Sequence, residues 1–253
     1  MPTPQSREVW IRERNFYLGM ALLMLAAVVL GFARTFFLKP LFPEVSHLAP
    51  AERYFYSVHG SLFVAWMLLL VAQPVLIALR KPALHRRLGW LGALLALAVL
   101  MAGVYASLLA AARPGGFLGV PVPPERFLVV PLTDIALFAG FVVLAIALRR
   151  QSQVHKRCML LATIGLLDAA VVRFPFADMA QPIVEGRFTL TDLGVDLFLL
   201  PMVLFDWKTL GRIHPATLWG GVLIVASQPL RMVVGESAAW AAFANALIAS
   251  VRP

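Results

Sequence analysis

Apolar residues occur in long runs along this chain, and short polar segments separate the runs. An α-helix needs about 20 mostly apolar residues to cross the hydrocarbon core of a bilayer. The pattern predicts seven such helices, at 16–37, 57–79, 88–112, 126–148, 158–176, 189–206 and 216–235. The sixth run is the weakest. We therefore predict an all-α, polytopic membrane bundle of seven transmembrane helices that forms one domain over residues 1–253.

The composition supports a membrane protein and excludes several other classes. The chain is 60% hydrophobic and 14% charged, whereas soluble proteins are about 45–50% apolar and about 25% charged. Its one cysteine, Cys158, excludes an intrachain disulfide and a cysteine-rich metal site. The net charge of +9 arises from basic residues in short connectors, which is typical of membrane topology. We expect the lipid bilayer as a partner, and no nucleic acid.

The distribution of basic residues predicts how the chain is oriented. Lys and Arg cluster in the N-terminal tail and in the connectors after the second, fourth and sixth runs. Such connectors normally lie in the cytoplasm. The opposite connectors, among them 113–125 and 177–188, contain the turn formers proline and glycine. We therefore expect a bacterial inner-membrane protein with a cytoplasmic N-terminus and a periplasmic C-terminus.

Residues 237–251 form a last apolar stretch, which spans only about 22 Å as a helix against a core of about 30 Å. Trp240 and Phe243 are three residues apart and lie on one helical face. This pattern favours a short interfacial or re-entrant helix. An eighth span that returns the C-terminus to the cytoplasm is the alternative.

Three carboxylates lie inside apolar runs, where each costs roughly 2.5–3.5 kcal/mol on insertion scales. Asp134, Asp168 and Asp196, together with Gln228, lie about two helical turns from the outer ends of four different runs. Nearer to the outer face we place the polar side chains Arg173, Arg231 and His59. The sequence therefore predicts one polar layer in the outer half of the bundle.

The polar layer has two interpretations. Three carboxylates outnumber two arginines, and buried ionisable groups in membranes generally carry function, so a site for a small ligand, an ion or a proton is expected. Such a site suits a transporter or a sensor. The alternative is a network that only fixes helix packing, in a structural or assembly protein. Whether the protein is an enzyme stays open.

Histidine residues occur in each predicted cytoplasmic connector, beside basic residues. They are His85, His155 and His214, and Asp206 lies on the same side. Imidazole and carboxylate groups are ligands for zinc and iron, so a divalent metal or haem b is a second hypothesis. It implies a membrane oxidoreductase. The neighbouring cations favour the alternative that these histidines are headgroup anchors at helix ends.

Residues 85–89 (HRRLG) and 155–159 (HKRCM) resemble two motifs of the bacterial membrane family called domain of unknown function 2306. The likeness covers about residues 57–176, and His59 matches the family's first histidine. The resemblance implies a helical inner-membrane protein. The layout is also distantly similar to cytochrome b561-type bundles, which implies haem between histidines on different helices. Only His59 stands on the outer side here, so two haems are not expected.

Overall fold

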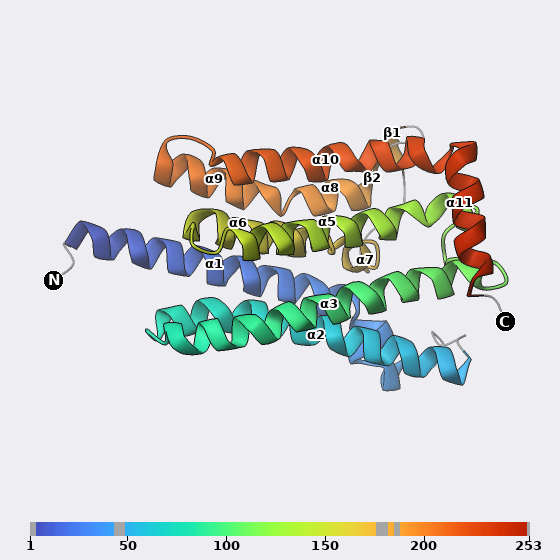
Figure 1. Cartoon of the computed structure of the whole chain (residues 1–253), viewed down its shortest axis with the longest axis horizontal. Coiled ribbons are helices and arrows are strands. Elements are labelled where there is room, and N and C mark those ends of the chain that lie inside the picture. Colours follow the sequence, from blue (N-terminus) through green and yellow to red (C-terminus); the bar gives the residue numbers. More distant parts are fainter. Residues whose placement is uncertain (1–3, 43–48, 176–181, 185–187, 252–253) are drawn as a thin grey trace.

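The computed structural model describes residues 4–42, 49–175, 182–184 and 188–251 of the chain. In this part the chain forms a helical bundle with one short hairpin (Figure 1). The first elements are α1 (Pro4–Gly31), η1 (Ala33–Phe37), η2 (Lys39–Leu41), α2 (Pro50–Ala78), α3 (Pro82–Ala112), α4 (Pro124–Phe127) and α5 (Val129–Ala147). They are followed by α6 (Ser152–Ile164), α7 (Asp168–Val171), β1 (Pro182–Val184), β2 (Phe188–Thr189), α8 (Leu190–Asp196), α9 (Leu199–Leu210), α10 (Pro215–Gly235) and α11 (Ala238–Ala249).

Five helical segments are long and apolar enough to cross a membrane. Within the described residues they are Glu8–Gly31, Pro50–Ala78, Pro82–Ala112, Pro124–Ala147 and Pro215–Gly235. They coincide with the first four predicted runs and with the seventh. The chain is therefore a multi-pass, all-α membrane protein, in which the fifth and sixth predicted runs differ from the other five.

The fifth run consists of two helices, α6 and α7, joined by a tight turn at 165–167. In this turn Leu166 and Leu167 donate backbone hydrogen bonds to residues three positions earlier, each 3.0 Å long. Such bonds are typical of a 3₁₀ turn, which often marks a hinge within a helix. Gly165, a weak helix former, begins the turn. The structure therefore has an interrupted helix here, where the sequence predicts a continuous span over 158–176.

The sixth run is interrupted in the same way, between α8 and α9. Phe198 donates to the carbonyl oxygen of Val195 at 3.0 Å. Pro201 lies in the first turn of α9, where it has no N–H to donate to the carbonyl oxygen of Leu197. Proline is tolerated in the first turn of a helix, where its missing N–H breaks no bond within that helix, so it is compatible with a helix that begins at Leu199. The predicted span at 189–206 is thus two short helices.

The two ends of the bundle differ in what they carry (Figure 1). The N-terminus and the α2–α3, α5–α6 and α9–α10 connectors lie at one end, and α11 lies at the other. The basic connectors therefore share one end, as the charge pattern predicts, and the connector 113–125 lies at the α11 end. Most of the connector at 177–188 falls outside the described residues.

Helix α11 lies across the end of the bundle (Figure 1). Its Trp240 Nε1 donates to the backbone oxygen of Glu125 at 2.8 Å. Ala244 and Ile248 are buried against α3 and the start of α5. With 12 residues, or about 18 Å, α11 is too short for an eighth span.

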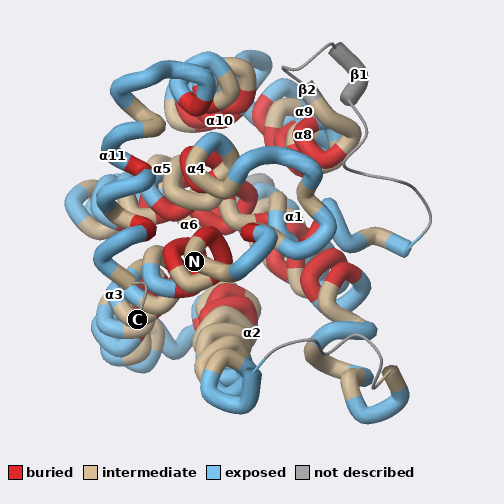
Figure 2. Tube along the Cα trace, turned by 90° about the vertical axis from the view of Figure 1, so that its right-hand side faces the viewer, coloured by how far each residue is buried: buried red, intermediate tan, exposed pale blue. Residues whose placement is uncertain are grey.

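Buried residues gather between the helices, and α6 lies near the centre of the end-on view (Figure 2). Apolar side chains on the outside, such as Trp90 and Leu94, are about two-thirds exposed, as expected for a surface that contacts lipid. At Gly31, α1 passes so close to α7 that an added Cβ would lie 2.2 Å from the carbonyl oxygen of Ala170. This close packing holds α7 against the core.

Candidate functional site

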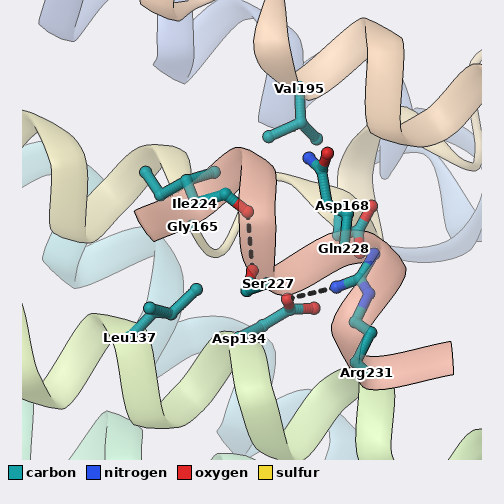
Figure 3. A pocket seen from close by; sticks show the side chains of 9 residues that line it. All are labelled: Asp134, Leu137, Gly165, Asp168, Val195, Ile224, Ser227, Gln228 and Arg231. Carbon is teal, nitrogen blue, oxygen red and sulfur yellow. Dashed lines mark hydrogen bonds and ion pairs between the residues drawn. The ribbon is translucent and has the colours of Figure 1, made fainter. Parts of the chain in front are cut away.

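Arg231, near the end of α10, is the centre of an ion-pair cluster. Its Nη1 donates to Asp134 Oδ1 at 2.7 Å, and its Nη2 donates to Asp168 Oδ2 at 2.8 Å and to Asp192 Oδ1 at 2.7 Å. The carboxylates come from α5, α7 and α8. Figure 3 shows Asp134 and Asp168 beside the guanidinium of Arg231. We call these four residues the Arg231 cluster.

The Arg231 cluster carries more negative than positive charge. Three carboxylates face one guanidinium, so two negative charges remain when every aspartate is ionised. The side chains of Arg231 and Asp192 are 5% and 1% exposed, and those of Asp134 and Asp168 are 14% and 13% exposed. Water therefore screens the excess charge poorly.

A fourth carboxylate lies beside the cluster. Gln228, one turn before Arg231 on α10, donates from Nε2 to Asp196 Oδ1 at 2.9 Å. Asp196 is one turn after Asp192 on α8, so the two aspartates lie on the same helical face. Through these contacts the polar layer extends from α5 across α10 to the end of α8.

The Arg231 cluster borders a small cavity (Figure 3). Its volume is about 10 Å³, which is close to the least that a water molecule needs. The cavity is lined by Asp134, Leu137, Gly165, Asp168, Val195, Ile224, Ser227, Gln228 and Arg231. In this conformation the site therefore has room for about one water molecule.

Asp192 is the member of the cluster that the sequence did not predict. It lies at the start of α8, where Thr189 donates to Asp192 Oδ2 from its backbone N–H and from its hydroxyl, each at 2.7 Å. Asp192 N–H donates in return to the Thr189 hydroxyl, forming a capping box. Oδ1 is then left for Arg231. In the sequence, the four-residue spacing between Asp192 and Asp196 was the pattern that could have identified Asp192 as a member of the polar layer.

The structure brings together five of the seven predicted ligand-binding residues, namely Asp134, Asp168, Asp196, Gln228 and Arg231. Two of these aspartates, Asp134 and Asp168, form ion pairs with Arg231.

The other two predicted residues make different contacts. Arg173 is exposed, lies over the ring of Phe32 at 5.0 Å and donates to the carbonyl oxygen of Ala169. No ion pair joins Arg173 to a carboxylate of the described residues. His59 packs against the ring of Phe55, with ring centres 6.5 Å apart. Neither side chain lines the cavity.

A second network lies nearer the opposite end of the bundle and centres on Arg157 in α6. Arg157 pairs with Asp206 of α9, whose Oδ2 also accepts from the Thr217 hydroxyl at 2.6 Å and from the His214 N–H at 3.1 Å. Arg157 and Asp206 are each 1% exposed. Lys156 pairs with Glu13 of α1 at 2.7 Å.

We call the charged residues Glu13, Lys156, Arg157 and Asp206, together with Gln153 and Thr217, the Arg157 network. Its two carboxylates match its two cations, so the network is neutral overall.

The four residues predicted as metal ligands do not gather at one place. Asp206 belongs to the Arg157 network, and His214 Nδ1 accepts from the backbone N–H of Ala216 at the start of α10. His85 and His155 are neighbours, with ring centres 6.4 Å apart. In the described ranges, no group of three or more His, Cys, Asp or Glu side chains is placed to hold a metal ion.

His214 is the titratable group at the start of α10. Burial lowers the pKa of His214, and the nearby Arg157 and Arg212 lower it further. The neutral ring suits its position, because Nδ1 must accept a hydrogen bond at the positive end of the α10 dipole.

No protein-family model, curated protein or solved structure matches the chain.

Proposed function

We propose that the protein binds and releases protons at the Arg231 cluster and acts as a proton-dependent transporter or sensor. The observation that supports this proposal is the excess of carboxylates around one guanidinium inside an apolar helical bundle. Clustered like charges in a poorly hydrated site favour the uptake of protons, which removes the repulsion. A site with matched charges would lack this tendency.

The size and centre of the site favour a proton over a larger ligand. The cavity has room for about one water molecule. The guanidinium of Arg231 occupies the position between the carboxylates that a metal cation would need. Calcium and magnesium also require about six or more oxygen ligands. A proton needs no further space.

The interrupted helices give proton binding a route to conformational change. Asp168 is the first residue of α7 and follows the turn at 165–167, and Asp196 is the last residue of α8 and precedes the turn at 197–198. Uptake of a proton by the cluster weakens the attraction between Asp168 and Arg231 and so favours a shift of α7 about its turn, against its packing on α1. Discontinuous helices adjoin the binding sites of many transporters.

The charge pattern places the Arg231 cluster in the periplasmic half of a bacterial inner membrane, if the basic connectors are cytoplasmic. In this orientation protons enter from the periplasmic side, and the Arg157 network lies on the cytoplasmic side. Residues 238–249 then form an interfacial helix on the periplasmic surface.

An infrared titration of the protein in lipid nanodiscs tests this function. We expect the wild-type protein to gain a carboxylic acid C=O band as the pH falls. Asp134→Asn, Asp168→Asn and Asp192→Asn should each reduce or shift the band. Glu236→Gln is the matched control, because Glu236 forms an ion pair with Arg126 at the exposed end of α10. An unchanged band in all three aspartate variants would contradict the proposal.

A transport assay then separates the two roles. In proteoliposomes that contain a pH-sensitive dye, a transporter dissipates an imposed proton gradient and Asp168→Asn does not. A sensor leaves the gradient intact but changes conformation with pH. A purely structural or assembly role predicts neither response.

A second candidate function is that of a b-type haem oxidoreductase, and the proximity of His85 and His155 favours it. The two rings lie on different helices, and His155 Nδ1 is 2.9 Å from the carbonyl oxygen of Ala145, which leaves Nε2 for a metal. An absorption spectrum of the purified protein tests this function. A Soret band that His85→Ala and His155→Ala both abolish would support it.

A further inference from the structure

An apolar groove lies on the outside of the bundle between α2 and α3, which form one side of the molecule in both views (Figure 1, Figure 2). Its volume is about 380 Å³, far larger than that of the polar cavity at the Arg231 cluster. Only alanine and leucine side chains line it: Ala65, Leu68, Leu69, Ala72, Leu91 and Leu95. Leu68 and Leu91 are more than half exposed, so the groove opens toward the lipid.

Small residues create the groove. Ala65 and Ala72 are seven residues apart, so they lie on the same face of α2, about 10 Å apart along its axis. At Gly92, α3 approaches α2 so closely that an added Cβ would lie 2.8 Å from Leu69 Cδ2. The short alanine side chains therefore leave a hollow among the leucines, and this hollow runs along the helices as an acyl chain does in a bilayer.

Exposed cations without a carboxylate partner gather where α2 turns into α3. They are Arg80, Lys81, Arg86 and Arg87, and no ion pair of the described residues includes any of them. At the start of α6, by contrast, Lys156 and Arg157 are paired with Glu13 and Asp206. The α2–α3 connector therefore carries positive charge that no described side chain neutralises.

The cations and the groove are neighbours on α3. Arg87 lies four residues before Leu91 and eight before Leu95, so the three residues share one stripe of the helix. Arg87 and Leu91 are then about 6 Å apart along the helix axis. Trp90, which is about two-thirds exposed, marks the level of the lipid headgroups, where tryptophan is enriched. The groove thus begins directly below this level.

The backbone at Arg80 is a second, independent observation. Arg80 N–H donates to the Ile77 oxygen at 3.0 Å and Lys81 N–H donates to the Leu76 oxygen at 2.8 Å, the pattern of a Schellman turn at the end of α2. Among the described residues, Arg80 is the one non-glycine residue with a positive φ, at 56°. Glycine is favoured at such a position, because a Cβ makes the left-handed conformation costly. An arginine at this cost points to a role for its side chain outside the turn.

An anionic phospholipid matches both parts of this surface. Its acyl chain fills an apolar groove, and its phosphate accepts hydrogen bonds from guanidinium groups. A zwitterionic lipid fits less well, because its ammonium group would face the same cations.

We propose that the α2–α3 hairpin binds one anionic phospholipid, with the phosphate among Arg80, Lys81 and Arg87 and one acyl chain in the groove. The site shares no residue with the Arg231 cluster. Lipid binding here therefore does not depend on the proposed proton function.

Native mass spectrometry of the full-length protein tests the proposal, with phosphatidylglycerol or phosphatidylcholine of identical acyl chains added to the detergent. We expect the wild-type protein to retain one phosphatidylglycerol and to bind phosphatidylcholine more weakly. A basic residue near a membrane surface contributes about fivefold to the affinity for anionic lipid, so Arg80→Gly and Arg87→Gln should each weaken phosphatidylglycerol binding by about that factor. Ala72→Leu should weaken the binding of both lipids, because it fills the groove.

Matched controls separate the site from general effects of charge and packing. Arg150→Gln removes one exposed charge from the α5–α6 connector at the same end of the bundle and should keep the lipid. Ala226→Leu, at an exposed position of α10, is the control for Ala72→Leu. Glycine suits the left-handed turn, so Arg80→Gly should unfold at a temperature no lower than the wild-type protein. Lipid loss in this variant then cannot result from a damaged fold.

Three results would overturn the proposal. The first is equal binding of the two lipids by the wild-type protein, which decides the matter even when Ala72→Leu fails to fold. The second is an equal loss of phosphatidylglycerol in Arg150→Gln and in Arg80→Gly. The third is a dimer without bound lipid that Ala72→Leu dissociates, which would show that a second copy of the chain occupies the groove.

Discussion

The Arg231 cluster and the Arg157 network are both built on a buried arginine, yet they differ in charge. In the Arg157 network two carboxylates match two cations, whereas in the Arg231 cluster three carboxylates face one guanidinium. A balanced network gains its full stability without further ions, which suits a fixed contact between helices. An unbalanced cluster retains excess charge that proton uptake removes. We therefore propose that charge balance separates a contact that only clamps helices from a site that binds protons in this protein.

The hydrogen bonds and the helices show the same difference. No side-chain atom of the Arg157 network is among the buried unpartnered atoms of the described chain, whereas Arg231 and Asp168 each contribute one. The helices α6, α9 and α10 are continuous at the Arg157 network, while the turns at 165–167 and 197–198 lie at the level of the Arg231 cluster. The Arg157 network thus lies within continuous helices, whereas the Arg231 cluster lies beside two interruptions in the helices.

The largest expected effect follows from breaking the balanced network. Asp206→Ala leaves Arg157 buried without its carboxylate, and we expect a loss of about 3–5 kcal/mol in the free energy of unfolding. Thermal unfolding in nanodiscs at neutral pH measures this loss. The double variant Arg157→Leu, Asp206→Leu should recover much of it, because no unpaired charge remains. Equal destabilisation by the single and double variants would contradict the clamp role.

A second prediction concerns the turn at 165–167. A Cβ at Gly165 would meet no atom nearer than 3.6 Å, so Gly165→Ala fits the observed conformation. Alanine favours a regular helix by up to about 1 kcal/mol over glycine, and the variant should resist movement of α7. We expect a smaller pH-dependent change in distance between spin labels on α7 and α10. Gly140→Ala, in open space on α5, is the control.

The start of α10 should respond to acid. The pKa of His214 in the folded protein lies below its ordinary value of 6.5, so the folded state binds fewer protons than the unfolded state. The stabilisation from neutral His214 is therefore complete above about pH 6.5 and is lost as the pH falls toward the lowered value. A lost helix cap costs about 1 kcal/mol. His214→Asn should retain the cap and remove this pH dependence, as unfolding measured at several pH values would reveal.

The smallest expected effect on stability comes from removing one carboxylate of the unbalanced cluster. Asp168→Asn keeps a side chain that accepts from Arg231 and reduces the excess negative charge. We expect a change of less than about 1 kcal/mol in the free energy of unfolding, with the proton response lost. A destabilisation as large as that of Asp206→Ala would show that the cluster is a clamp as well.

The sequence predicted the parts of this molecule that depend on hydropathy and depth. Five apolar runs lie in helical segments long enough to cross a membrane, and the similar depth of Asp134 and Asp168 agrees with the contact of both with Arg231. The direction of Arg173 was not predictable in this way, because the turn at 165–167 changes the helical phase of every later residue in that run. Asp192 was missed because a capping residue at the start of a run resembles an ordinary interfacial group. Both features depend on backbone geometry rather than on composition.

The most direct test of the central claim is an infrared titration that compares Asp168→Asn with Asp206→Asn. Each variant replaces one aspartate that accepts a hydrogen bond from an arginine. Asp206 is buried and Asp168 is half-buried. If the Arg231 cluster is the proton site, Asp168→Asn loses or shifts the wild-type carboxylic acid band, and any folded Asp206→Asn protein retains it. A band that survives Asp168→Asn and disappears in Asp206→Asn, or one that is absent from the wild-type protein, would contradict this account.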